Sequence, residues 1–213
     1  MFYLVIDFET NGVGQDAQNG YKPHPPERAP LPRPNYPVQL AAELLNPHGT
    51  VVRSAQMLVS GAQRLDPWVI THCPHIRLED CNHGGVDFAH AVRVLADMAG
   101  DDCRPCTLVA HNIQYDWDEV LCVTAATCAI EETPEFRRLA SLPRHCTCVN
   151  EENKRAKTSY YFQRIGRWIG PKLSALAHEC GVAFDPARAH DAAYDVRVTS
   201  QCLVYLKRLH APA

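Results

Sequence analysis

The first ten residues place two acidic side chains at the end of an apolar segment. Residues 2–6 (FYLVI) are uninterruptedly apolar, and Asp7 and Glu9 follow almost at once. Side chains alternate between the two faces of a strand, so residues at i and i+2 project on the same side. Two neighbouring carboxylates repel each other, and their burial is costly unless a cation compensates. Either this strand simply ends in a solvated turn, or a sheet buries its apolar part and gathers the two acids into a polar site.

The rest of the chain supplies the remaining strands and helices. Turn residues at 46–49 (NPHG) separate two strand-like segments, so the first three strands are predicted to form an antiparallel meander. Strands are predicted over residues 2–8, 38–45, 51–59, 106–110 and 144–149, and helices over 86–98, 114–128, 171–180 and 191–209. This order indicates an α/β fold with a mixed five-stranded sheet, in which parallel strands extend the meander and helices flank the sheet.

Length and composition are those of a soluble globular protein. The 213 residues fit one domain spanning 1–213, and 46% of them are apolar and 21% charged. No apolar run approaches the roughly 20 residues that span a bilayer, and the N-terminus lacks a signal-peptide pattern. We therefore expect an intracellular protein, cytoplasmic or nuclear, that is not secreted and does not contact a membrane.

The ten cysteines favour reduced thiols over disulfides. Several of them, such as Cys122, Cys180 and Cys202, stand among apolar neighbours, where a thiol packs as a small hydrophobic group. A structural zinc site is an alternative, with Cys103 and Cys106 as one half-site or a set on Cys73, His75, Cys81 and His83. Neither has the paired spacing of a familiar zinc finger.

Two segments have unusual composition. A proline-rich insertion at about 14–37 favours an extended surface loop, with a role as a ligand for an SH3-like partner as the alternative. A loop at about 150–170 interleaves basic and aromatic residues, and residues 137–172 carry nine Lys or Arg against two acids although the chain has a net charge of −3. Such a mixture suits a single-stranded nucleic acid. The aromatic residues could equally be packing anchors.

Further acidic residues occupy comparable positions after the first strand. Asp116 stands at the start of the helix that follows strand 106–110, and Asp195 lies in the first turns of the last helix, five residues after His190. Loops that follow adjacent strands of an α/β sheet converge at one end, where sites usually form. Carboxylate oxygens are the ligands that Mg²⁺ prefers, so the sequence predicts a site for hard divalent cations.

Three short motifs together carry a family resemblance. Asp7-Phe8-Glu9-Thr10, His111-Asn112 with Asp116, and His190-Asp191-Ala192 with Asp195 resemble, in order and spacing, the motifs of the DEDDh (DnaQ-like) 3′-to-5′ exonucleases, which belong to the ribonuclease H-like superfamily. The likeness covers most of the chain apart from the proline-rich insertion and residues 150–168. The chain departs from the pattern at residues 73–75 (CPH), which replace the family's usual small residues.

The resemblance implies a two-metal active site. By matched position, Asp7, Glu9 and Asp195 would hold one Mg²⁺ or Mn²⁺ ion, and Asp7 and Asp116 a second. His190 would take a proton from the attacking water. The main chain at Thr10, Asn11 and Gly12 would cradle the terminal nucleotide, and His111 and Asn112 would shape the substrate-binding loop.

The expected activity is metal-dependent 3′-to-5′ hydrolysis of single-stranded or frayed DNA, with release of nucleoside 5′-monophosphates. An RNA-directed exoribonuclease of the same family and a non-catalytic adaptor that binds nucleic acid or protein are the alternatives. The expected partners are nucleic acid 3′ ends, with DNA favoured over RNA. A polymerase or replication protein acting in trans and the oligomeric state are left open.

Overall fold

Five strands form one mixed sheet in the order β3-β2-β1-β4-β5. The computed structural model describes residues 1–12, 35–100, 104–149 and 170–209. β1 pairs antiparallel with β2, and β2 antiparallel with β3, whereas β4 is parallel to both β1 and β5. The strands are β1 (Phe2–Thr10), β2 (Pro37–Leu45), β3 (Val51–Leu58), β4 (Cys106–Ala110) and β5 (Arg144–Cys146). β1 is therefore the central strand, and its acidic end lies in the middle of one edge of the sheet.

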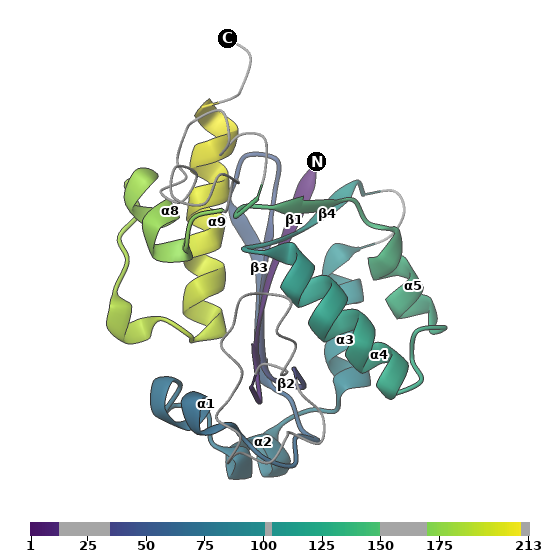
Figure 1. Cartoon of the computed structure of the whole chain (residues 1–213). Coiled ribbons are helices and arrows are strands. Elements are labelled where there is room, and N and C mark those ends of the chain that lie inside the picture. Colours follow the sequence, from purple (N-terminus) through teal and green to yellow (C-terminus); the bar gives the residue numbers. More distant parts are fainter. Residues whose placement is uncertain (13–34, 101–103, 150–169, 210–213) are drawn as a thin grey trace, which may run out of the picture.

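Helices cover both faces of the sheet (Figure 1), with α8 and α9 on one side and α3, α4 and α5 on the other. α1 and α2 lie near one end of the sheet in this view. The helices are α1 (Pro67–His72), α2 (Leu78–Gly84), α3 (Phe88–Ala99), the π-helix η2 (Tyr115–Cys122), α4 (Val123–Thr127), α5 (Pro134–Ser141), α8 (Leu173–Glu179), the 3₁₀ turn η3 (Pro186–Arg188) and α9 (Ala192–Leu209).

The alternation of β1 divides the core into two layers. Leu4, Ile6 and Phe8 belong to the large cluster that includes the buried residues of α3 and η2, whereas Val5 packs with Val196 and other residues of α9. Asp7 and Glu9 share the face of Val5 because they follow it at intervals of two. The two carboxylates are therefore directed to the side of the sheet that α9 covers, whereas Phe8 packs in the large cluster on the other side.

The predicted five-stranded α/β architecture is confirmed, and most strand bounds agree within two residues. The fifth strand was predicted too long: β5 ends at Cys146, because its partner β4 ends at Ala110, the residue opposite Cys146. The predicted helix 114–128 begins as a π-helix. Three short helices, α1, α2 and α5, were not predicted.

The described residues omit 13–34 and 150–169. Most of the proline-rich insertion and of the basic and aromatic loop therefore lies outside them. The proline-rich insertion was predicted to reach residue 37, but Tyr36 is buried and Pro37 begins β2. The nine described cysteines are free thiols; the tenth, Cys103, is not described. In the portion of the chain that the structure describes, no helix has both the length and the apolar character to cross a membrane.

Candidate active site at the acidic end of the central strand

Asp116 reaches the central strand at the point where β4 stops pairing with it. The parallel register of β1 and β4 ends at Val5, opposite Val109, so the later part of β1 has no strand on that side. The backbone N–H of Phe8 donates instead to the Asp116 carboxylate over 3.1 Å. Asp116 is only 2% exposed and lies in the first turn of η2, a helix type that is frequent at functional sites.

The start of α9 is fixed by a loop with an uncommon backbone. His190 has φ of 65°, in the left-handed region, and its backbone N–H donates to Asp195 Oδ2 over 2.9 Å. The Asp195 N–H in turn donates to the Asp191 carbonyl. This short ring of bonds holds His190 and Asp195 at one end of the helix.

Gln39 joins this loop to the sheet. Its Nε2 donates to Asp191 Oδ1 over 3.3 Å, and its Oε1 accepts the N–H of Ala192 over 3.1 Å. Gln39 is 3% exposed and is the β2 partner of Glu9 in the antiparallel register. Gln39 thus hydrogen-bonds both Asp191, the residue before α9, and the first backbone N–H of the helix. It therefore fixes the start of α9 next to the acidic end of β1.

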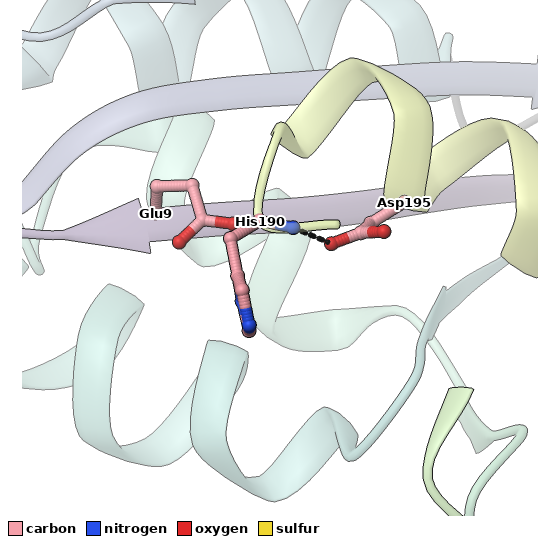
Figure 2. Close-up of side chains that lie close together, drawn as sticks. All are labelled: Glu9, His190 and Asp195. Atoms are coloured by element: carbon pink, nitrogen blue, oxygen red, sulfur yellow. Dashed lines mark hydrogen bonds between the residues drawn. The ribbon is translucent and has the colours of Figure 1, made fainter. Parts of the chain in front are cut away.

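Glu9, His190 and Asp195 converge on one point (Figure 2), each with a ligand atom within 4.8 Å of the others. Glu9 comes from β1, Asp195 from the first turn of α9, and His190 from the loop that precedes this helix. Asp195 Oδ1 is buried and has no hydrogen-bond partner, although a buried carboxylate oxygen normally has one. An unpartnered oxygen among carboxylates and an imidazole fits a hard divalent cation.

The carboxyl groups behave as one electrostatic cluster. Burial raises the pKa of Asp7 well above its ordinary value, and the charges of Asp116 and Glu9 add to this effect. Burial likewise raises the pKa of Glu9 to about 8 and that of Asp116 to about 8, and Asp195 adds to the effect at Glu9. Burial raises the pKa of Asp195 to about 6, although its bond from His190 acts in the opposite direction. These acids lie close enough to oppose one another's ionisation, which a bound cation would relieve.

Partial burial lowers the pKa of His190, and the positive charges of the nearby His72 and His75 act in the same direction. The imidazole is therefore held toward its neutral form, in which one ring nitrogen can accept a proton. His190 lies beside Glu9 and Asp195, and its assignment as the proton acceptor stays a prediction.

The residues that follow Glu9 are held within the protein. Thr10 Oγ1 and Tyr115 Oη share a hydrogen bond of 2.9 Å. The Asn11 side chain accepts the N–H of Tyr36 over 2.9 Å, and the Asn11 carbonyl accepts the N–H of Asp66 over 2.8 Å. Gly12 offers its carbonyl to the backbone of Asn35. The assignment of Thr10, Asn11 and Gly12 to the terminal nucleotide stays a prediction.

His111 uses both ring nitrogens inside the protein. Nδ1 pairs with Thr147 Oγ1 and Nε2 with the Pro171 carbonyl, each over 3.0 Å. Burial lowers the pKa of His111 to about 4, so the ring is neutral near pH 7. Asn112 is exposed, with φ of 72°. This arrangement supports a loop-shaping role for His111, and the assignment of both residues to the substrate side stays a prediction.

The zinc alternative finds no support in the geometry of the described residues. Cys73 and Cys81 belong to the hydrophobic core, whereas His75 and His83 are exposed. Among the described residues, the three side chains that lie close enough together to share a metal ion are Glu9, His190 and Asp195.

Several residues at this end of the sheet were not found from the sequence. Gln39 acts through tertiary register, which no local pattern shows. Tyr115 precedes the motif residue Asp116, but its bond to Thr10 depends on the parallel placement of β1 and β4. Trp68 lies against His190 from the unpredicted helix α1. The pair Asp66-Pro67 could have indicated the start of that helix, since Asp is a favoured N-cap and Pro a favoured first residue.

Comparison with known proteins identifies the fold. No family model and no curated protein sequence matches the chain. Solved structures do match over almost its whole length. A 3′-exonuclease, described as recognising the 3′ end of a histone mRNA stem-loop, has a TM-score of 0.64 and 15% identity over 98% of this chain and 82% of that one.

Exonuclease I structures match equally well. The enzyme from Methylocaldum szegediense has a TM-score of 0.65 and 16% identity over 99% of this chain, and that of E. coli in complex with a dT13 oligonucleotide has a TM-score of 0.64 and 16% identity over 97%. In both cases this chain spans 41% of the length of the matched chain. The chain therefore has the ribonuclease H-like fold of the 3′-exonucleases and exonuclease I, as the resemblance of its three motifs predicted.

Proposed function

We propose that this protein is a metal-dependent 3′-to-5′ exonuclease that removes nucleoside 5′-monophosphates from the 3′ end of a nucleic acid strand. The observation that carries the proposal is the convergence of Glu9, His190 and Asp195 within 4.8 Å, with Asp195 Oδ1 buried and unpartnered. Asp7 and Asp116 extend this cluster, because the charges of Asp116, Glu9 and Asp195 add to the effect of burial in raising the pKa of Asp7. Neither a structural role nor a simple binding role needs buried carboxylates that repel one another.

The carboxylates act as a cation site. Asp7, Glu9 and Asp195 would hold one divalent ion, and Asp7 with Asp116 a second, by the motif assignment. Mg²⁺ or Mn²⁺ supplies Lewis acidity at the phosphate and stabilises charge on the attacking and departing oxygens. Asp116 is held in place by its bond from the Phe8 N–H, and Asp195 by its bond from the His190 N–H.

His190 moves the proton in this scheme. A water oxygen forms a bond to phosphorus while the bond from phosphorus to the 3′-oxygen of the preceding nucleotide breaks. The water proton passes to the neutral imidazole, and the departing 3′-oxygen takes a proton from solvent. A neutral histidine exposed beside the acidic cluster suits this role.

The substrate we propose is single-stranded or frayed DNA, with RNA as the alternative. The matched structures include one with a stem-loop RNA and one with a dT13 oligonucleotide, so the fold accommodates both in other proteins. A time course on single-stranded DNA, on a duplex with a mismatched 3′ end and on short RNA separates these substrates. Cleavage of a circular strand would instead indicate an endonuclease.

The decisive experiment is release of a 3′-terminal label from single-stranded DNA with Mg²⁺ or Mn²⁺. Asp195→Ala is expected to lower kcat by at least about 10³-fold, because it removes a ligand that works as a unit with the others. Asp118→Ala, which removes an exposed acid of the same sign, is the matched control and should stay within about twofold. Asp195→Ala activity within tenfold of wild type would overturn the proposal.

A further inference from the structure

Among the residues that the structure describes, His190 has no side-chain partner of the kind that usually orients a catalytic histidine. Such a base is commonly held by a third group that hydrogen-bonds its second ring nitrogen. Within the described residues, the bond at His190 is made by its backbone N–H to Asp195, and no hydrogen bond reaches either ring nitrogen. The side chain is exposed. Its two side-chain torsions therefore need another restraint if the ring is to stay over the carboxylates.

The ring contact on His190 comes from Trp68 in α1. The two ring centroids lie 5.1 Å apart and the planes meet at 79°, an edge-to-face arrangement that aromatic pairs favour. Trp68 is 44% exposed, so its indole is not an anchor of the hydrophobic core. A large aromatic side chain left this open on a six-residue helix indicates a role at the site it faces.

Trp68 is itself held by its neighbours. The His72 ring stacks on the indole with centroids 4.3 Å apart and planes at 11°, and His72 Nδ1 lies 2.8 Å from the Trp68 carbonyl oxygen. The backbone N–H of Trp68 donates to Asp66 Oδ1 over 2.7 Å, and the Asp66 N–H donates to the Asn11 carbonyl. The backbone of α1 at Trp68 is thus linked to the end of β1, the strand that carries Glu9.

We propose that Trp68, backed by His72, is a positioning residue that holds the His190 imidazole over the acidic cluster. This inference rests on the proposed function and assigns a supporting role at the same site. Both the base and its support are tied to the acidic end of β1, one through Asp195 and Gln39, the other through Asn11. Loss of the aromatic contact releases the ring without removing any metal ligand.

A double-mutant cycle with His190→Ala tests the assignment on 3′-labelled single-stranded DNA. Trp68→Ala is expected to lower kcat about 3- to 10-fold with little change in KM, as expected for one lost aromatic pair, and Trp68→Phe should recover most of the loss. In the His190→Ala background, Trp68→Ala should have no further effect on kcat. Ile70→Ala, at a 58% exposed position of the same helix, is the matched control and should leave kcat unchanged.

An equal loss in both backgrounds would overturn the positioning role, because it would mean that Trp68 acts on substrate or on the fold. NMR of the His190 ring protons tests the same contact without reference to activity. Trp68→Ala should remove the ring-current shift of these protons, and Ile70→Ala should not; unchanged His190 resonances in Trp68→Ala would also overturn the inference. A wild-type protein without nuclease activity overturns the proposed function instead, and the resonances still decide whether Trp68 holds the ring.

Discussion

Asp116→Asn is expected to stabilise the metal-free protein above neutral pH while it removes nuclease activity. Asparagine keeps the shape of aspartate and retains an Oδ1 that can accept the Phe8 N–H, now 3.1 Å from the carboxylate. It removes a negative charge from a side chain that is only 2% exposed. The substitution therefore preserves the hydrogen bond and relieves the repulsion among the buried carboxylates.

The magnitude follows from the pKa of Asp116, which burial raises from 3.8 to about 8. A rise of that size corresponds to on the order of 5 kcal/mol between the protonated and ionised forms. Because the folded protein keeps this proton to a higher pH than the unfolded chain, the free energy of unfolding should fall as pH rises from about 4 to about 8. Since the neighbouring acids share the repulsion, we expect the variant to regain roughly 2–3 kcal/mol at pH 8.

Urea unfolding followed by circular dichroism, in chelator and at several pH values between about 5 and 8, measures this effect. The wild type should lose stability across that range and the variant should lose less. Asp118→Asn, at an exposed position of the same helix, should follow the wild type. Saturating Mn²⁺ should stabilise the wild type by more than the variant. A variant less stable than wild type at pH 8 without metal, or wild-type stability that rises with pH, would refute the reasoning.

Two further substitutions test the supports of the site. Gln39→Leu leaves Asp191 Oδ1 and the Ala192 N–H without their partner, so it should lower the free energy of unfolding by about 1–3 kcal/mol and reduce nuclease activity. The control Gln56→Leu, at an exposed position of β3, should change the free energy of unfolding by less than about 0.5 kcal/mol. An equal effect of both changes in urea unfolding would contradict the role of Gln39. His111→Ala should cost about 2–4 kcal/mol and speed hydrogen exchange of the Thr147 amide, and an unchanged exchange rate would show that the imidazole does not hold this segment.

The sheet could be predicted because its strands carry strong local signals. β2 and β4 are almost continuously buried and β1 is buried over Leu4–Ile6, so their apolar runs mark them clearly. The π-helical geometry of η2 could not be predicted. Trp117, Val120 and Leu121 would share one buried face in an α-helix as well as in a π-helix, so their spacing does not distinguish the two. α1 has too few residues for apolar periodicity to be read. α5, by contrast, carried a missed signal in its N-cap Thr133 followed by Pro134.

The residues of the site likewise fall into those that the sequence predicts and those that it does not. Asp7, Glu9, Asp116, Asp195 and His190 could be named because their residue types carry the chemistry and their order carries the resemblance. In the structure, Glu9, His190 and Asp195 lie close together, and their assignment as site residues stays a prediction. Gln39 could not be named, since a glutamine on a buried strand becomes informative only when the register places it opposite Glu9 and beside Ala192. Which residues support a site depends on the tertiary arrangement of the strands and helices, and the sequence alone does not show that arrangement.

The hydrogen bonds of His111 also hold two distant parts of the chain together beside the site. One imidazole bonds both Thr147, just after β5, and Pro171, just before α8, so it fixes these two residues beside each other. Their placement does not depend on the length of the chain between them, because both bonds are made to the same side chain. Insertions or deletions in that stretch are therefore expected to leave His111 and the loop after β4 in place.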